Sequence, residues 1–249
     1  MIFRSANIEL AQPVSDIVER DYRTAAVFRK YGIEYCCAGK KSLEAACFIA
    51  GVNIDQVKNE LDLASRKHPE LTNLPFETWH VDFLTAYIVN VHHHFIREAL
   101  PEAVSVVGQF AEHHEKKFPH MQEVTQLLKN LHEEIIPRLS YEEDVLFPYM
   151  CQVEHAFENN GDYGRLLVKT LRKPLEQMSL QHHQLINETI LRLRELTTDY
   201  LPVAGACLSH RLSMQLINAI DNDLSQHIYL ENEILIPRVL SREKSLLGH

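Results

Sequence analysis

Apolar side chains recur every three or four residues along most of the chain, the spacing of one face of an α-helix. Beyond residue 77 this pattern predicts four long helices, and no segment indicates a strand convincingly. The expected ranges are 78–100, 122–150, 174–198 and 207–238. Pro101 is expected to kink or restart the first of these helices. Four long helices predict an all-α, up-and-down four-helix bundle.

The first seventy residues predict shorter helices, separated by glycines and turn residues. Their expected ranges are 16–31, 42–50 and 55–67. Such a segment has too few apolar positions to be very stable alone. A linker at residues 69–76 carries two prolines. We therefore expect a small helical domain over residues 1–72 and the bundle over residues 73–249.

The bundle contains an internal repeat, which should be sought before any single motif is trusted. Residues 142–148 (EEDVLFP) match residues 231–237 (ENEILIP) at an offset of 89. The same offset relates His93 to His182, so a histidine precedes each glutamate by 49 residues, 142 − 93 and 231 − 182. That spacing takes the chain along one helix and back to a similar height on the next. The histidines and glutamates should therefore converge at one level, with each Leu-x-Pro phrase ending the metal-bearing part of its helix.

His227 and Glu231 lie four residues apart, which places both on one face of a helix. Imidazole and carboxylate are ligands that first-row transition metals accept. Of the triplet at residues 92–94, only one side chain can face the bundle axis squarely, and the repeat selects His93. The predicted metal ligands are His93, Glu142, His182, His227 and Glu231.

The repeat also reveals a missing ligand, because subtracting 89 from 227 leads to Arg138. Arginine stays cationic and has no lone pair to donate. Two alternatives remain open. Either a second metal site is completed by water or by a substitute such as Glu134, His132 or His94, or the second metal is lost and Arg138 pairs with Glu142.

The composition of the 249 residues is that of a globular protein, with 45% hydrophobic and 24% charged residues. A net charge of −9 argues against nucleic-acid binding, which needs a basic face. No apolar run has the length of a membrane span, and the first fifteen residues lack the apolar core of a signal peptide. We therefore expect a cytoplasmic protein.

The five cysteines are odd in number and widely scattered, which favours reduced thiols over a disulfide framework. Cys36 and Cys37 are adjacent, and Lys40 and Lys41 follow closely. Nearby lysines favour thiolates, which bind iron, accept nitric oxide or exchange redox equivalents. The alternative is a pair of small buried side chains in a turn.

The chain resembles the RIC (repair of iron centres) family of di-iron proteins over nearly its whole length. These proteins join an N-terminal cysteine-pair domain to a hemerythrin-like bundle. In the first domain the resemblance rests on residues 28–40 (FRKYGIEYCCAGK). In the bundle it rests on His93 before residues 97–102 (REALPE), Glu142 in EEDVLFP, His182, and His227 with Glu231.

The resemblance implies a non-haem di-iron centre held by four histidines and two bridging glutamates. His93, His182 and His227 match family histidines, and Glu142 and Glu231 match the bridging glutamates. The fourth family histidine falls on Arg138, the position that the repeat also singles out.

The function that the resemblance implies is repair of iron–sulfur clusters damaged by nitric oxide or peroxide. The centre would deliver iron to damaged iron–sulfur proteins, and Cys36 and Cys37 would serve in transfer or protein contact. The expected partners are those recipients and, in a homodimer, a second copy of this chain. Nucleic acid and membrane are not expected.

Two other functions remain open. One is a hemerythrin-like sensor or scavenger of O2 or NO with an incomplete, mononuclear iron site. The other is a structural protein whose metal site has decayed, with Arg138 closing a salt bridge. The ligand types also do not choose among iron, manganese and zinc.

Overall fold

The computed structural model describes residues 8–20, 24–33, 40–64, 74–159, 162–171, 173 and 175–248. For residues 19, 20, 25, 26, 29, 162 and 176–185 it describes the backbone alone. All regular elements in these ranges are helices, apart from one isolated antiparallel bridge between Pro13 and Ser42. The predicted all-α fold is confirmed. No helix within these ranges is long and apolar enough to cross a membrane.

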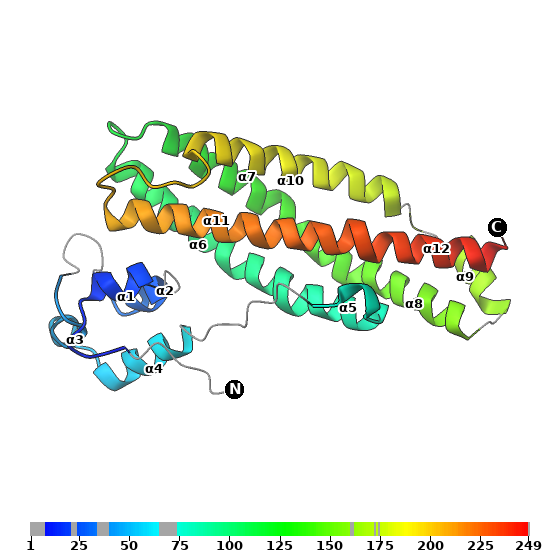
Figure 1. The fold of residues 1–249 in the computed structure, drawn as a ribbon, viewed down its shortest axis with the longest axis horizontal. Helices are drawn as coiled ribbons and strands as arrows, with labels where there is room; N and C mark the ends of the chain where they lie inside the picture. The colour runs from blue at the N-terminus through cyan, green and yellow to red at the C-terminus, as the bar shows by residue number, and fades with distance from the viewer. Residues whose placement is uncertain are drawn as a thin grey trace. The chain divides into compact units, whose positions relative to one another are not determined.

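The chain forms two compact units. One comprises residues 1–73 with 200–217, and the other comprises residues 74–199 with 218–249. The helices at the beginning of the first unit are α1 (Val14–Arg20), α2 (Thr24–Lys30), α3 (Leu43–Ala50) and α4 (Ile54–Ala64). They are drawn in blue and cyan in Figure 1.

Helix α3 shows how local sequence sets the bounds of these short helices. The Ser42 hydroxyl accepts a hydrogen bond from the Ala45 amide at 3.2 Å and so caps the first turn. Gly51 ends the helix at φ +67°, a backbone conformation that residues with a side chain rarely adopt. Glu60 on α4 accepts from Lys30 at 2.8 Å and from Tyr31 at 2.7 Å, which ties the end of α2 to α4.

Three long rods and one further helix make the bundle of the second unit. The first rod joins α5 (Val81–Tyr87), η2 (Ile88–His93) and α6 (His94–His113). The second joins α7 (His120–Tyr141), η3 (Glu142–Leu146) and α8 (Phe147–Glu158). The third joins α11 (Leu208–Tyr229), η4 (Leu230–Leu235) and α12 (Ile236–Leu247), and residues 208–217 of α11 are counted with the first unit. The fourth helix is α10 (Leu175–Thr197), and the short helices η1 (Phe76–Thr78) and α9 (Asp162–Leu171) complete the unit.

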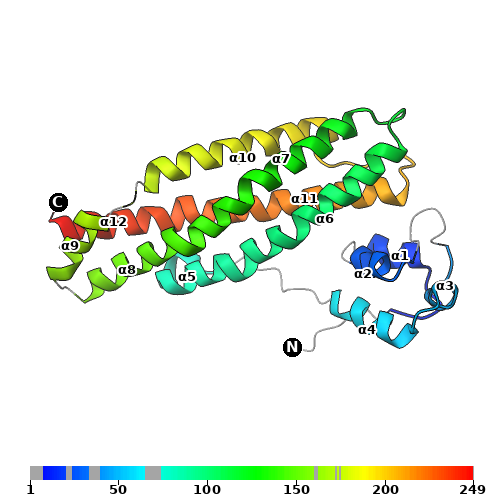
Figure 2. The same cartoon turned by 180° about the vertical axis from the view of Figure 1, so that it is seen from behind.

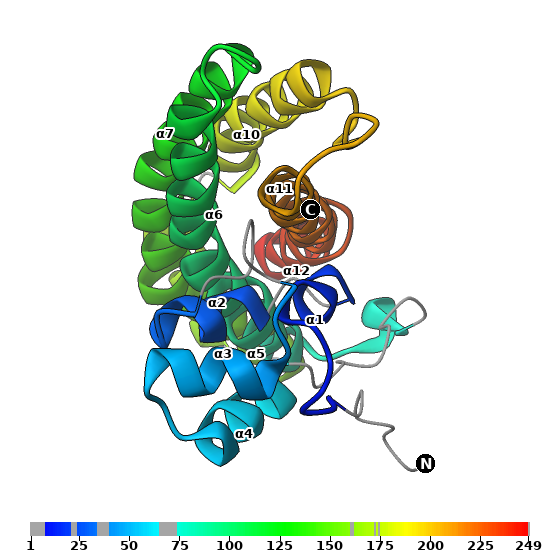
Figure 3. The same ribbon diagram turned by 90° about the vertical axis from the view of Figure 1, so that its left-hand side faces the viewer.

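The rods pack along most of their length. Helix α7 contacts both α6 and α10, and α8 contacts α5 and α12. Figures 1 and 2 show these elements side by side from opposite directions, and Figure 3 looks along them, with α6 and α7 on one side and α12 on the other.

Three predicted helix ends are wrong. The first long helix does not end near Leu100 but continues through Pro101 to His113. Proline removes one backbone hydrogen bond, yet Ala103, Val107 and Phe110 extend the buried apolar stripe beyond it. The second and fourth long helices also run further than expected, because α8 ends at Glu158 and α12 at Leu247 instead of at residues 150 and 238.

The core of the second unit has apolar layers on both sides of the level at which the predicted ligands lie. One layer includes Leu84, Ile88, Met150, Leu230 and Leu235, all at most 2% exposed. The other includes Ile96, Leu100, Leu128, Leu139 and Leu224, all fully buried. Polar groups between these layers are therefore removed from water and need partners within the protein.

Two glycines in this unit should respond oppositely to alanine. A Cβ at Gly164 would lie 2.7 Å from Leu246 Cδ2 and 3.2 Å from Ala156 Cβ, whereas at Gly108 it would meet only Thr125 Cγ2 at 3.5 Å. We expect Gly164→Ala to lower the free energy of unfolding by about 1 kcal/mol through overpacking. Gly108→Ala should raise it by about 0.5–1 kcal/mol, because alanine favours the helix. Urea unfolding of both variants measures this, and a stabilised Gly164→Ala would contradict the packing.

Candidate metal centre

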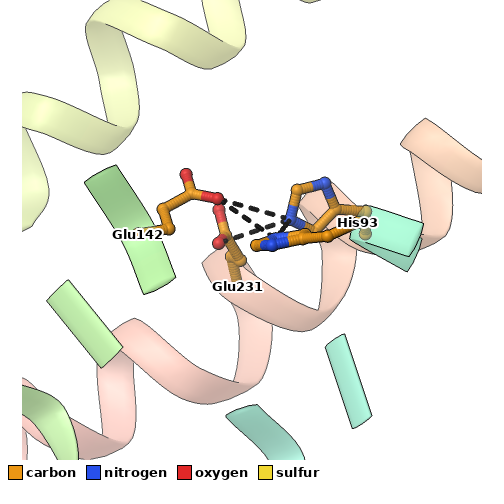
Figure 4. A group of neighbouring side chains, drawn as sticks. His93, Glu142 and Glu231 are labelled. Atoms are coloured by element: carbon orange, nitrogen blue, oxygen red, sulfur yellow. Dashed lines mark hydrogen bonds and ion pairs between the residues drawn. The ribbon is translucent and has the colours of Figure 1, made fainter. Parts of the chain in front are cut away.

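Four of the five predicted ligands meet in the bundle core. His93, Glu142, His227 and Glu231 are each at most 3% exposed, and each offers a donor atom within 4.8 Å of the others. They come from η2, η3, α11 and η4, so all three rods contribute. Figure 4 shows His93, Glu142 and Glu231 pointing toward one another from separate segments.

The distances between donor atoms suit a single metal ion. His93 Nε2 lies 3.3 Å from His227 Nε2 and 3.3 Å from Glu142 Oε2. His227 Nε2 lies 3.4 Å from Glu231 Oε1 and 3.8 Å from Glu142 Oε2. A tetrahedral ion with bonds of about 2.0–2.1 Å separates its ligand atoms by roughly 3.3 Å. The set therefore fits a cation with only small shifts of the side chains.

Each rod widens into a π-helical segment at its ligand. His93 ends η2, Glu142 begins η3, and Glu231 is the second residue of η4. The Phe147 amide donates to the Glu142 carbonyl, five residues back, and the Ile236 amide donates to the Glu231 carbonyl in the same way. Such segments are rare and occur frequently at functional sites.

The prolines of the repeat explain two of these π-helical segments. Pro148 and Pro237 have no amide to donate to the residue four positions back, and their rings clash with its carbonyl. The preceding turn relieves this by widening, which turns the ligand carbonyl toward the residue five positions ahead. Pro148 and Pro237 are also 89 residues apart, so the repeated sequence carries the repeated geometry.

Glu143 fixes the orientation of His93. His93 Nδ1 and Arg97 Nη1 each lie 2.6 Å from Glu143 Oε1. Burial raises the pKa of the Glu143 carboxyl, but the hydrogen bonds from Arg97 and His93 outweigh burial and lower it. An ionised Glu143 therefore accepts the Nδ1 proton of His93, and the Nε2 lone pair of His93 points toward the other three ligands.

The surroundings of His227 favour positive charge. Burial lowers its pKa, but Glu231, Glu142 and Asp223 together raise the pKa to about 9. A cation that enters the group must therefore displace a proton from this ring at neutral pH. The Oε2 atom of Glu142 is buried and has no hydrogen-bond donor among the described residues, which also suits a cation-binding position.

Arg138 pairs with Glu142, as the second of the two sequence-based alternatives expects. Its Nε atom donates to Glu142 Oε1, and both side chains are buried. Only the Oε2 atom of Glu142 then faces His93 and His227. Neither His94 nor Glu134, both considered as substitutes, is buried, and no substitute belongs to the described ligand group.

Three predicted site residues lie outside the described part of the chain. His182 belongs to α10, but its side chain is not among those described, and neither Cys36 nor Cys37 is described at all. Sequence reasoning missed Glu143, because the repeat places Asn232 at the equivalent position. It also missed His92, which is 1% exposed and lies 2.9 Å from Asp223 through Nδ1. Asp223 stands four residues before His227 and therefore on the same helix face. This spacing is the signal that could have identified Asp223 and, with it, its partner His92.

Comparisons with known proteins agree with this centre. Residues 85–239 match the family described as hemerythrin HHE cation binding domain, and residues 10–65 match a family described as a domain of unknown function, DUF542. The iron–sulfur cluster repair protein YtfE of Enterobacter sp. (strain 638) is 28% identical over 232 residues, covering 93% of this chain and 98% of that protein.

Two further relatives carry the same name. YtfE of Salmonella schwarzengrund (strain CVM19633) is 29% identical over 237 residues, and YtfE of Escherichia coli O81 (strain ED1a) is 28% identical over 239 residues. Each alignment covers 93% of this chain and 98% of the relative. The resemblance inferred from the motifs is confirmed by these matches.

Because Glu143 holds His93 in place, its loss should weaken metal binding without removing a ligand. We expect Glu143→Gln to weaken Fe2+ affinity by roughly 10–100-fold, the usual effect of removing a carboxylate behind a histidine ligand. Anaerobic competition with a chromophoric chelator measures the affinity. Glu98→Gln is the matched control, because Glu98 is exposed and faces His94 at 3.6 Å on the surface. Equal affinity of Glu143→Gln and wild type would disprove the role of Glu143.

Proposed function

Because the chain belongs to the hemerythrin family of HHE cation-binding domains, we propose that it holds non-haem iron and repairs iron–sulfur clusters damaged by nitrosative or oxidative stress. The observation that carries this proposal is the buried group of two imidazoles and two carboxylates within 4.8 Å of one another. The relatives named for iron–sulfur cluster repair align over nearly the whole chain and supply the biological role.

The proposed iron ligands are His93, Glu142, His227 and Glu231, with His182 as a fifth. Iron bound there supplies a redox-active ion held by nitrogen and oxygen alone. Nitrogen and oxygen ligands bind such an ion less firmly than thiolates bind soft metals. The ligand set therefore suits an ion that is to be released. Iron is therefore the cargo of the reaction as well as the occupant of the centre.

The residues around the centre compensate charge when iron leaves. The Arg138 guanidinium pairs with Glu142, and a proton on His227 balances Glu231. Two buried carboxylates thus face two cations, which avoids leaving an unpaired charge in the core. Glu143 keeps the proton of His93 on Nδ1, so this ring is ready to bind again. This charge balance supports reversible loading and release of iron.

The first unit would contribute to the transfer of iron or to recognition of the recipient protein. We assign Cys36 and Cys37 to that step, within a domain spanning residues 1–72 that precedes the bundle at residues 73–249. The recipients would be damaged iron–sulfur proteins in the cytoplasm. A homodimer would bring a second centre to the same recipient.

Arg138 gives weight to a second function, an O2 or NO sensor with one iron. The guanidinium takes the Oε1 atom of Glu142, which in a bridging carboxylate would bind the second metal. A mononuclear centre with fewer protein ligands leaves coordination positions to a small molecule. Iron content shows whether Arg138 abolishes the second iron position, and the repair assay below separates a sensor from a repair protein.

Iron content therefore tests the role of Arg138. We expect one iron per chain in wild type after anaerobic reconstitution and two in Arg138→His, which restores the histidine that the repeat calls for. Arg192→His is the matched control, because Arg192 is an exposed arginine of α10. Iron is measured by elemental analysis against protein. Two irons in wild type would show that another group completes the second site, and none in any chain would refute iron binding itself.

Repair is tested directly on an iron–sulfur dehydratase inactivated with nitric oxide. Anaerobic, iron-loaded protein should restore its activity, whereas Glu231→Ala should not, because it removes a ligand and leaves His227 without its carboxylate. Glu233→Ala is the control, since Glu233 lies two residues further along and is exposed. A wild type that binds iron and a small molecule but restores no activity would favour the sensor.

A further inference from the structure

A second group of metal-binding side chains lies at the surface, where α5 begins and α8 ends. His80, Asp82 and His155 each offer a donor atom within 4.8 Å of the other two. His80 and Asp82 stand at the first turn of α5, and His155 stands in the last turn of α8. None of these residues takes part in the buried centre.

The group is well separated from the buried centre. Thirteen residues separate His80 from His93 on one rod, 93 − 80, and thirteen separate Glu142 from His155 on the other, 155 − 142. At 1.5 Å per residue this is roughly 20 Å along each helix. The surface group therefore cannot share an ion with the buried ligands.

The donor distances suit a small transition-metal ion. Asp82 Oδ2 lies 3.5 Å from His80 Nδ1 and 2.7 Å from His155 Nε2. The first distance is close to the roughly 3.3 Å between ligand atoms of a tetrahedral zinc ion. The second is a hydrogen bond that must open by about 0.6 Å to admit the ion. All three side chains are between 40% and 52% exposed, so such a shift meets little resistance.

Glu158 prepares His80 to act as a ligand. His80 Nε2 lies 3.0 Å from Glu158 Oε1, so this nitrogen carries the proton and donates it to the carboxylate. The Nδ1 lone pair then points toward Asp82, whose amide donates to it at a long 3.3 Å. Metal-binding histidines commonly donate their other ring proton to a carboxylate in this way. The contact between His80 and Glu158 thus supports the metal site independently of the distances among the three ligands.

One oxygen of Asp82 has no hydrogen-bond partner among the described residues. This atom is Oδ1, which is buried, whereas Oδ2 accepts a hydrogen bond from His155. The His80 and His155 rings are stacked, with centroids 5.9 Å apart and an angle of 26° between their planes.

We propose that His80, Asp82 and His155 form a surface site for a divalent transition-metal ion such as Zn2+. Two imidazoles and one carboxylate are a donor set that zinc binds, and solvent fills the remaining position. The ion would fasten the first turn of α5 to the last turn of α8. Its binding does not depend on iron or on cluster repair.

The test is a zinc titration of chelator-treated full-length protein. The four chains are wild type, His155→Ala, Glu231→Ala and the double variant. We expect His155→Ala to lose one zinc per chain both in the wild-type background and in the Glu231→Ala background. Loss in both shows that the surface site is independent of the buried centre, because separate sites have additive effects.

Further variants of the same titration sharpen the assignment. Asp82→Asn should weaken the surface site by roughly 100-fold and Glu158→Gln by roughly tenfold. His113→Ala, at an exposed histidine outside the group, should change nothing. Zinc should raise the unfolding temperature of wild type more than that of His155→Ala. Equal zinc content of wild type and His155→Ala, or a loss that disappears when Glu231 is replaced, would overturn the proposal.

Discussion

Two carboxylates buried between apolar layers are the constraint on which the bundle core depends. Glu142 and Glu231 are each 2% or less exposed, and unpaired charges at such depth are strongly destabilising. The chain meets this constraint with Arg138 against Glu142 and with a raised pKa at His227 beside Glu231. A metal ion in the same place would provide positive charge to both. The core would then tolerate two charge states, as the proposed loading and release of a cation requires.

Helix geometry at the centre follows from the proline phrases as much as from the ligands. Pro148 and Pro237 each stand six residues beyond a glutamate ligand, and each is preceded by a π-helical segment that contains that glutamate. Without the wider turn, the flanking helices would present different faces to the core. Prolines ordinarily interrupt helices. Here they orient the two glutamates toward the same level of the core, and the rods continue beyond them. The third segment, at η2, contains no proline, and the structure offers no local reason for it.

The sequence predicts the helices and most of the ligand group because both depend on periodic patterns. The repeat identifies His93, Glu142 and Glu231, and the four-residue spacing to Glu231 identifies His227. The structure brings these four side chains together, and metal binding by them stays a prediction. Glu143 and the surface group escape this reasoning. Asn232 stands opposite Glu143 in the repeat, and His80 meets His155 through packing of residues 75 positions apart, 155 − 80. The expected helix end at Pro101 is wrong because the buried apolar stripe continues past the proline.

Arg138 is the position at which the two halves of the internal repeat differ most in their chemistry. The repeat would place a histidine at residue 138, and the arginine there converts a ligand position into a fixed positive charge. A fixed charge stabilises Glu142 whether or not a cation is present, so it lowers the energetic difference between the loaded and empty centre. The same substitution reduces the number of ligands available to a second ion. Under the proposed function, easier release and fewer ions would be linked consequences of one residue. They would act on iron donation in opposite directions, because each ion would leave more readily but each chain would carry fewer ions.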